Sequence, residues 1–143
     1  MVLVVLAPFF GALSDRIGRR PLLIGFATAI LVLAYPALWL LTAVPNPSTL
    51  TIVLLVFAVL IAGFTGPAPA AMAELYPPQV RSTGLSIAYN FAVTIFGGFA
   101  PFIATALIAR TGNPLAPAWY VVFAAAASLV ALLAAGSALR NKD

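Results

Sequence analysis

The sequence predicts an all-α fold, a polytopic transmembrane helix bundle. Of its 143 residues, 64% are hydrophobic and only 7% are charged, and the mean hydropathy is +1.14. A soluble domain carries about 25% charged residues, so this chain has too few to cover an aqueous surface. The apolar residues also fall into long runs that Pro, Gly and Arg residues separate. Composition and run length together indicate an integral membrane protein.

The first apolar run, residues 1–14, is too short to cross a bilayer. As a helix it reaches only about 20 Å, whereas the hydrocarbon core is about 30 Å thick. It lacks the basic start and the cleavage site of a signal peptide. We therefore expect it to be the inner end of a transmembrane helix. On this interpretation the chain is a C-terminal fragment of a longer protein, or a truncated gene model.

Four further apolar runs are long enough to span, because 23 helical residues reach about 34 Å. They predict helices at 22–44, 50–73, 83–109 and 117–139. The first and last of these four are almost featureless, so we expect them to lie at the periphery and to face lipid. Lys and Arg are unevenly divided between the two sides, with Arg110 alone on one side and the others opposite: Arg16, Arg19, Arg20, Arg81, Arg140 and Lys142. The positive-inside rule then puts the C-terminus in the cytoplasm.

The run at 50–73 carries small residues on one face. Five residues lie within about 100° of one another on a regular helix: Gly63, Gly66, Pro67, Ala70 and, at the end of the run, Glu74. Small residues let a second helix approach closely, and a proline break in lipid is tolerated only against protein or a water-filled cavity. A packing notch and a hinge that lines a pathway are both consistent with this face.

The run at 83–109 carries polar and small residues at spacings of 4, 4, 3, 4 and 4, which predict one stripe. Its members are Ser86, Asn90, Thr94, Gly97, Pro101 and Thr105. Such a stripe either holds helices together through hydrogen bonds or faces an aqueous substrate cavity. On the second interpretation, the candidate cavity-lining residues are Thr65, Ser86, Tyr89, Asn90 and Thr94.

A dense group of charges, "GALSDRIGRRP", follows the first run. Asp15 falls at the C-terminal end of a helix, where the helix dipole disfavours an anion. The arginines alone agree with a topology anchor with weak surface ion pairs. A latch that holds one conformation also accounts for Asp15 and for the acid of the second turn. We expect this latch to involve Gly11, Asp15, Arg16, Gly18, Arg19, Arg20, Glu74 and Arg81.

Several function classes are excluded by the residues that the sequence lacks. It has no Cys and no His, which excludes disulfides and a metal site built from those ligands. The basic residues form no helix face that would bind nucleic acid. No nucleophile is paired with a base in the spans, so we expect no enzyme activity, no metal site and no cofactor.

The charged segment resembles a known signature. G-x-x-x-D-R-x-G-R-R, at residues 11–20, is similar to the loop of the major facilitator superfamily that occurs between helices 2 and 3 and again between helices 8 and 9. "AELYPPQVRSTG" (73–84), "IFGGF" (95–99) and "TGNPLAPAWY" (111–120) resemble its metabolite:proton symporter branch. That branch includes carriers for citrate, α-ketoglutarate, shikimate and proline or betaine.

The resemblance implies where the chain falls in that fold. Four spans after the loop match the second copy, in the C-terminal six-helix half of a twelve-helix fold. The chain would hold the end of helix 8 (1–14), helix 9 (22–44), helix 10 (50–73), helix 11 (83–109) and helix 12 (117–139). Its partners would be the lipid bilayer, a small-molecule substrate and the missing N-terminal helices of the same carrier, in the cell inner (plasma) membrane.

The resemblance also implies a function, the transport of a small metabolite by alternating access. The substrate class it favours is an organic acid such as citrate, and the coupling ion it implies is the proton. The charge network would stabilise the outward-open state. No acid lies within the spans, so the proton-coupling group would lie in the absent helices. The alternatives are a carrier for a proline/betaine osmolyte, a sugar or a drug, and a non-functional truncated membrane fragment.

Overall fold

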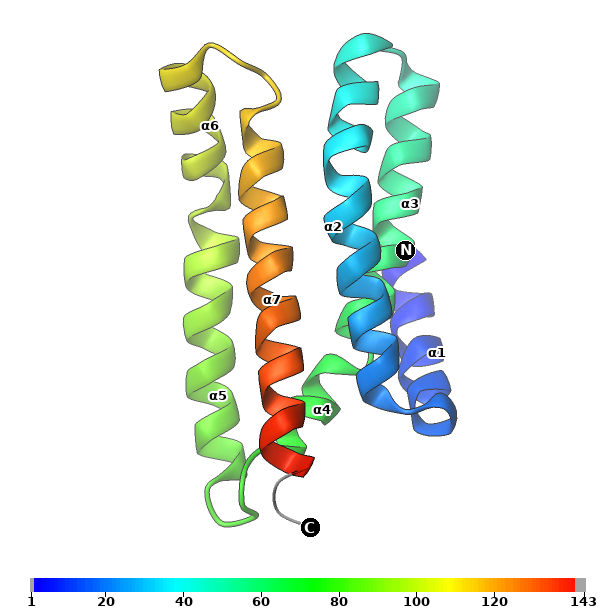
Figure 1. Cartoon of the computed structure of the whole chain (residues 1–143). Helices are drawn as coiled ribbons and strands as arrows, with labels where there is room; N and C mark the ends of the chain where they lie inside the picture. Colours follow the sequence, from blue (N-terminus) through cyan, green and yellow to red (C-terminus); the bar gives the residue numbers. More distant parts are fainter. Residues whose placement is uncertain (1, 141–143) are drawn as a thin grey trace.

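In the computed structural model, which describes residues 2–140, the chain is helical throughout apart from short turns (Figure 1). No strand occurs within this range, so the predicted all-α fold class is confirmed. The elements in chain order are α1 (Val2–Ile17), α2 (Arg19–Ala43), α3 (Pro47–Thr65), α4 (Ala68–Glu74), α5 (Arg81–Ala92), the π-helix η1 (Val93–Gly98), α6 (Ala100–Thr111) and α7 (Ala116–Arg140).

Four helical segments of the described chain are long and apolar enough to cross a membrane. They are Arg19–Ala43, Pro47–Glu74, Arg81–Thr111 and Ala116–Ala135. Most helix ends differ by one to three residues from the ends of the predicted apolar runs, and at α3 a capping residue sets the start. The side chain of Asn46 accepts the Ser48 N–H at 3.1 Å, which caps α3 ahead of its first apolar residue.

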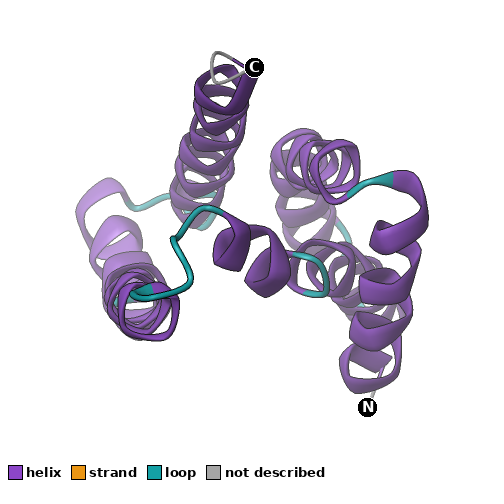
Figure 2. Ribbon diagram, turned by 90° about the horizontal axis from the view of Figure 1, so that it is seen from below, coloured by secondary structure: helices purple, strands orange, loops and turns teal. Residues whose placement is uncertain are grey.

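The helices form two groups. α1, α2 and α3 pack together on one side, while α5, η1, α6 and α7 form the other (Figure 1). The short helix α4 runs between the two groups at one end of the molecule, as the view along the helices shows (Figure 2). α2 packs closely along α7, so this seam joins the groups.

The seam between α2 and α7 is an extensive packing contact that the sequence pattern did not reveal. Both helices were expected to lie at the periphery and face lipid, and in the structure each also buries one face: together they hold half of the buried residues of the described chain. Ala27 and Ala34 of α2 and Ala118 of α7 are at most 1% exposed. The rings of Tyr35 and Trp119 also meet across the seam, with centroids 6.1 Å apart. Alanine faces read as featureless in a hydropathy plot, yet they allow two helix backbones to approach closely.

The small residues of the third run form a packing notch. A Cβ atom added to Gly66 would collide with the carbonyl oxygen of Ala7 on α1, and one added to Gly63 would enter the ring of Phe26 on α2. Pro67 is fully buried, and the helix breaks at Gly66 and Pro67 between α3 and α4. The break thus lies against protein, where an interrupted helix is tolerated.

The run predicted as one helix at 83–109 contains a π-helical interruption, which the sequence pattern did not reveal. The Phe99 N–H donates to the Thr94 carbonyl at 3.3 Å, five residues back. A π turn inserts about one extra residue, which shifts the helix phase by about 100°. The prediction of one continuous stripe from Ser86 to Thr105 is therefore wrong, because residues after η1 are out of phase with those before it.

Candidate functional site

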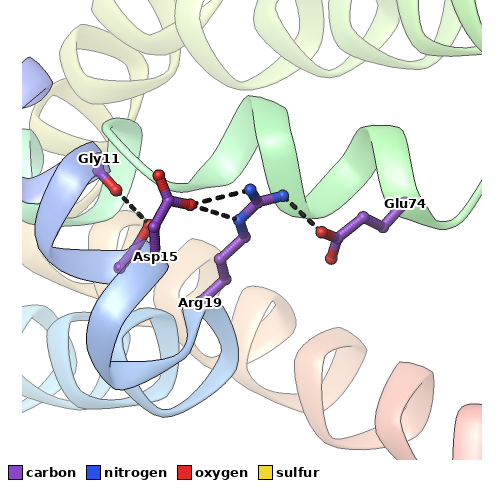
Figure 3. A network of polar contacts seen from close by, with 5 residues as sticks. Gly11, Asp15, Arg19 and Glu74 are labelled. Atoms are coloured by element: carbon purple, nitrogen blue, oxygen red, sulfur yellow. Dashed lines mark hydrogen bonds and ion pairs between the residues drawn. The ribbon is translucent and has the colours of Figure 1, made fainter.

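A network of charged side chains lies at one end of the molecule. The Arg19 guanidinium donates to Asp15 Oδ1 through Nη2 at 2.9 Å and through Nε at 3.3 Å. Its Nη1 donates to Glu74 Oε1 at 2.5 Å, so one arginine bridges two carboxylates (Figure 3). The three residues come from α1, α2 and α4. A contact between residues 55 positions apart thus joins the start of α2 to the end of α4.

Each member of this network lies at a helix end that disfavours its charge. Asp15 is in the last turn of α1, and Glu74 is the last residue of α4, so both anions lie at negative dipole ends. Arg19 is the first residue of α2, where the positive end of the dipole disfavours a cation. The side chains therefore compensate one another, and removal of any one leaves its partners in an unfavourable field.

The network lies next to one buried residue, Ser14, while its two carboxylates are exposed. Ser14, the residue before Asp15 in α1, is 1% exposed, and its hydroxyl donates to the Gly11 carbonyl at 2.6 Å. Gly18, at φ 104°, supplies the reversal that brings Arg19 back toward Asp15. The network lines an open hollow of about 400 Å³. The side chains of Asp15 and Glu74 are 60% and 62% exposed, so these ion pairs are in contact with solvent and each contributes little to stability.

The other arginines of the predicted latch lie outside the network. Arg20 turns toward α7, where its Nη2 lies 3.4 Å from the carbonyl oxygens of Leu132 and Leu133. Arg16 and Arg81 are exposed, and no hydrogen bond or ion pair within residues 2–140 joins either of them to the network. The sequence pattern grouped these arginines with the network because Arg16 and Arg20 are close to Arg19 in the chain, and because Arg81 is in the same turn as Glu74.

The candidate cavity-lining residues of α5 and η1 lie on an exposed surface. Ser86, Tyr89, Asn90 and Thr94 are all exposed. The Asn90 amide donates to the Ser86 carbonyl of its own helix at 2.8 Å. No hydrogen bond of the described chain joins Asn90 to another helix. We call Ser86, Tyr89, Asn90 and Thr94 the polar face of α5.

Thr65, the remaining candidate, is at the end of α3. It is exposed, and its hydroxyl donates to the Ile61 carbonyl at 2.7 Å. No hydrogen bond in the described part of the chain joins it to the polar face of α5. The same part of the chain contains no group of three acidic, His or Cys side chains that could hold a metal ion.

One contact of this region was not predicted from the sequence. The Tyr120 hydroxyl of α7 donates to the Phe96 carbonyl of η1 at 2.8 Å. The signal available in the sequence was Pro101, which lacks an N–H and so leaves a carbonyl of the preceding turn without its backbone donor.

The fold and the charge network define a polytopic helical membrane protein with an ion-paired junction at one end. Comparison with protein families identifies the class of membrane protein: the model of the Major Facilitator Superfamily matches residues 1–142. The chain belongs to this superfamily, which agrees with the signature at residues 11–20. The relatives found are symporters and transporters by name, in agreement with the expectation that the chain is not an enzyme.

Three relatives illustrate the similarity. The citrate-proton symporter of Salmonella typhi is 41% identical, over 87% of this chain and 29% of the relative. The citrate-proton symporter of Klebsiella pneumoniae is 40% identical, over 91% of this chain and 30% of the relative. The ectoine/proline transporter ProP of Corynebacterium glutamicum is 35% identical, over 93% of this chain and 26% of the relative. The chain thus spans less than a third of the length of these relatives. No solved structure matches it at a significant level.

Proposed function

We propose that this chain is part of a proton-coupled carrier that moves a small organic acid, with citrate as the first candidate, by alternating access. The observation that carries the substrate class is the similarity to the two citrate-proton symporters, at 41% and 40% identity. The ectoine/proline transporter is less similar, at 35%. The coupling ion in this proposal is the proton, and no cofactor takes part.

In the proposed carrier, the contacts of Arg19 with Asp15 and Glu74 act as a latch. They hold α1 and α2 against α4 in the outward-open state and separate when the carrier opens inward. The exposure of both carboxylates supports this role, because such ion pairs exchange with water at small cost. The latch end and the C-terminus face the cytoplasm in this proposal. Lys142 of the basic tail lies outside the described residues.

The polar face of α5 and Thr65 line the substrate path in the proposed carrier. Exposed amide and hydroxyl groups in a segment long enough to cross a membrane are costly in lipid, so we place them against water, substrate or the other helices of the carrier. The three acids of the sequence are Asp15, Glu74 and Asp143. None lies within a predicted span, and we therefore place the proton-coupling group in helices outside this chain.

A zwitterionic osmolyte is the second candidate substrate. The relative that favours it is the ectoine/proline transporter, which covers 93% of this chain. A zwitterion differs from citrate in carrying a cationic group, so the two classes need different counter-charges in the site. Competition between substrates distinguishes them.

The test is uptake of labelled citrate, α-ketoglutarate, shikimate and proline by the carrier that contains this chain, in proteoliposomes. We expect citrate uptake that a protonophore abolishes and that excess proline leaves unchanged. Proteoliposomes without the carrier are the control. Citrate uptake that is insensitive to the protonophore contradicts the proton coupling, and proline uptake without citrate uptake favours the osmolyte class.

A further inference from the structure

The π-helix η1 contains a carbonyl oxygen that lacks its π-type backbone donor. In a π-helix, the carbonyl of residue i accepts from the N–H of residue i+5. For Phe96 that residue is Pro101, which has no N–H. In an α-helix, Pro101 would instead be the donor to Gly97. One proline thus prevents both patterns from continuing through this point of the span.

A side chain from another helix supplies a donor there. The Tyr120 hydroxyl, on the second turn of α7, donates to the Phe96 carbonyl oxygen at 2.8 Å. Tyr120 is half-buried, whereas Phe96 and the rest of η1 are exposed. This contact joins α7, which packs against α2, to the span Arg81–Thr111 at the point where η1 interrupts it.

The π turn sets the direction of the polar residues around it. If η1 relaxed to an α-helix, about one residue would be removed from the turn, and α5 would rotate by about 100° relative to α6. Thr94 lies within η1 and Asn90 lies just before it, so both would turn with α5. Whatever stabilises the π turn therefore decides which way these two side chains face.

We propose that Tyr120 is a positioning residue: its hydroxyl replaces the N–H that Pro101 lacks and holds the π turn, so that Asn90 and Thr94 face the substrate path. The part that concerns the path rests on the proposed function of the polar face of α5. The part that concerns the π turn stands on the geometry alone, and the two parts are tested separately.

The hydrogen bond is tested by selective labelling of the 143-residue chain in lipid bilayers. With ¹³C-carbonyl Phe and ¹⁵N-Gly, only the Phe10–Gly11 and Phe96–Gly97 peptides give Phe–Gly correlations in solid-state NMR. We expect Tyr120→Phe to move the Phe96 carbonyl resonance upfield, as loss of a hydrogen bond does, while the Phe10 resonance stays in place. Tyr35→Phe is the control. A Phe96 resonance that Tyr120→Phe leaves unmoved overturns the proposal.

A second substitution tests whether Tyr120 replaces the missing N–H. Pro101→Ala restores that donor within the helix itself. In the Pro101→Ala background, we expect Tyr120→Phe to change neither the Phe96 resonance nor uptake any further. If Tyr120→Phe has the same effect in both backgrounds, the hydroxyl does not act in place of the proline N–H, and this result overturns the proposal.

The positioning role is tested by uptake kinetics of the carrier that contains this chain. We expect Tyr120→Phe to raise the KM for citrate by about fivefold, the size of one ordinary net hydrogen bond, with Vmax per folded carrier unchanged. Tyr35→Phe leaves both values unchanged. A moved Phe96 resonance with an unchanged KM overturns the positioning role but leaves the transport proposal intact. A carrier that takes up none of the tested compounds overturns the proposed function, and the positioning role falls with it.

Discussion

The charge network and the polar face of α5 are two polar regions of one chain, and they differ in where their side chains find hydrogen-bond partners. Arg19 bonds to two other helices, whereas Asn90 bonds only to its own helix. No residue of Arg81–Thr111 is buried, while Ser14 next to the network is almost fully buried. The conformation of the network is thus determined by contacts within this chain, and the polar face of α5 is free to contact water, substrate or other helices.

We expect the largest effect when the helices that hold the charge network are forced apart. In Gly66→Ala, the new Cβ atom collides with the Ala7 carbonyl, so α1 must move away from α3 and carry Asp15 with it. We expect a loss of about 3 kcal/mol in the free energy of unfolding, as for overpacking of a tight contact. Denaturant unfolding in lipid micelles measures it.

Gly25→Ala is the control for this substitution, because it adds the same methyl group to a helix where nothing lies within 4 Å. If Gly66→Ala unfolds at the same denaturant concentration as Gly25→Ala, the close approach of α1 and α3 does not contribute to stability.

The sequence predicted more of the network than of the polar face, for a physical reason. Asp15 and Glu74 stood out because each is a charge in an apolar chain, and a charge near a bilayer needs a partner. The partner of Arg20 could not be predicted in the same way, because backbone carbonyls such as that of Leu132 leave no mark in a sequence pattern. The pairing of Arg19 with Glu74 could not be predicted in this way either, because it depends on where α4 lies after the break between α3 and α4.

The fold was predictable at the level of spans, because run length and hydropathy determine which segments cross a membrane. Two features were not. The π turn of η1 breaks the 3.6-residue period on which the stripe prediction rested, and Pro101 alone does not reveal which pattern the backbone adopts. The most deeply buried residues of the seam between α2 and α7 are alanines, whose hydropathy is the same against lipid as against another helix.

Exchange of the charges of Arg19 and Glu74 tests whether the network acts as a latch. We expect Glu74→Arg to lower uptake by about tenfold, within the usual range of a coupling between two conformational states. The addition of Arg19→Glu restores uptake only in part, because the new carboxylate then lies four residues from Asp15 and repels it. A third change, Asp15→Asn, removes that repulsion and raises uptake further. Initial uptake rates per folded carrier measure all three.

Arg81→Glu is the control for the charge exchange, since Arg81 is exposed and lies outside the network. We expect it to lower uptake less than Glu74→Arg does. Purely additive effects of Glu74→Arg and Arg19→Glu contradict the latch, because residues in contact show a coupling energy in a double-mutant cycle.

The smallest expected effect concerns the polar face of α5. Asn90→Ala removes an amide that bonds only to its own helix, so we expect the free energy of unfolding to change by no more than about 0.5 kcal/mol. If the amide contacts substrate, the KM rises by about fivefold. Thr28→Val is the control: Thr28 is equally exposed, and its hydroxyl also bonds only to its own helix, at the Ile24 carbonyl. A stability loss larger than that of the control contradicts the contrast between the two regions.

The single residue between α1 and α2 has a consequence for how the chain enters a membrane. Only Gly18 separates the two helices, and they run in opposite directions (Figure 1). A link of one residue gives the second helix little room to choose its own orientation, so we expect α1 and α2 to insert into a bilayer as one unit. The arginines at residues 16, 19 and 20 then stay together on one side of the bilayer. We expect the orientation of the later segments to depend on that one turn.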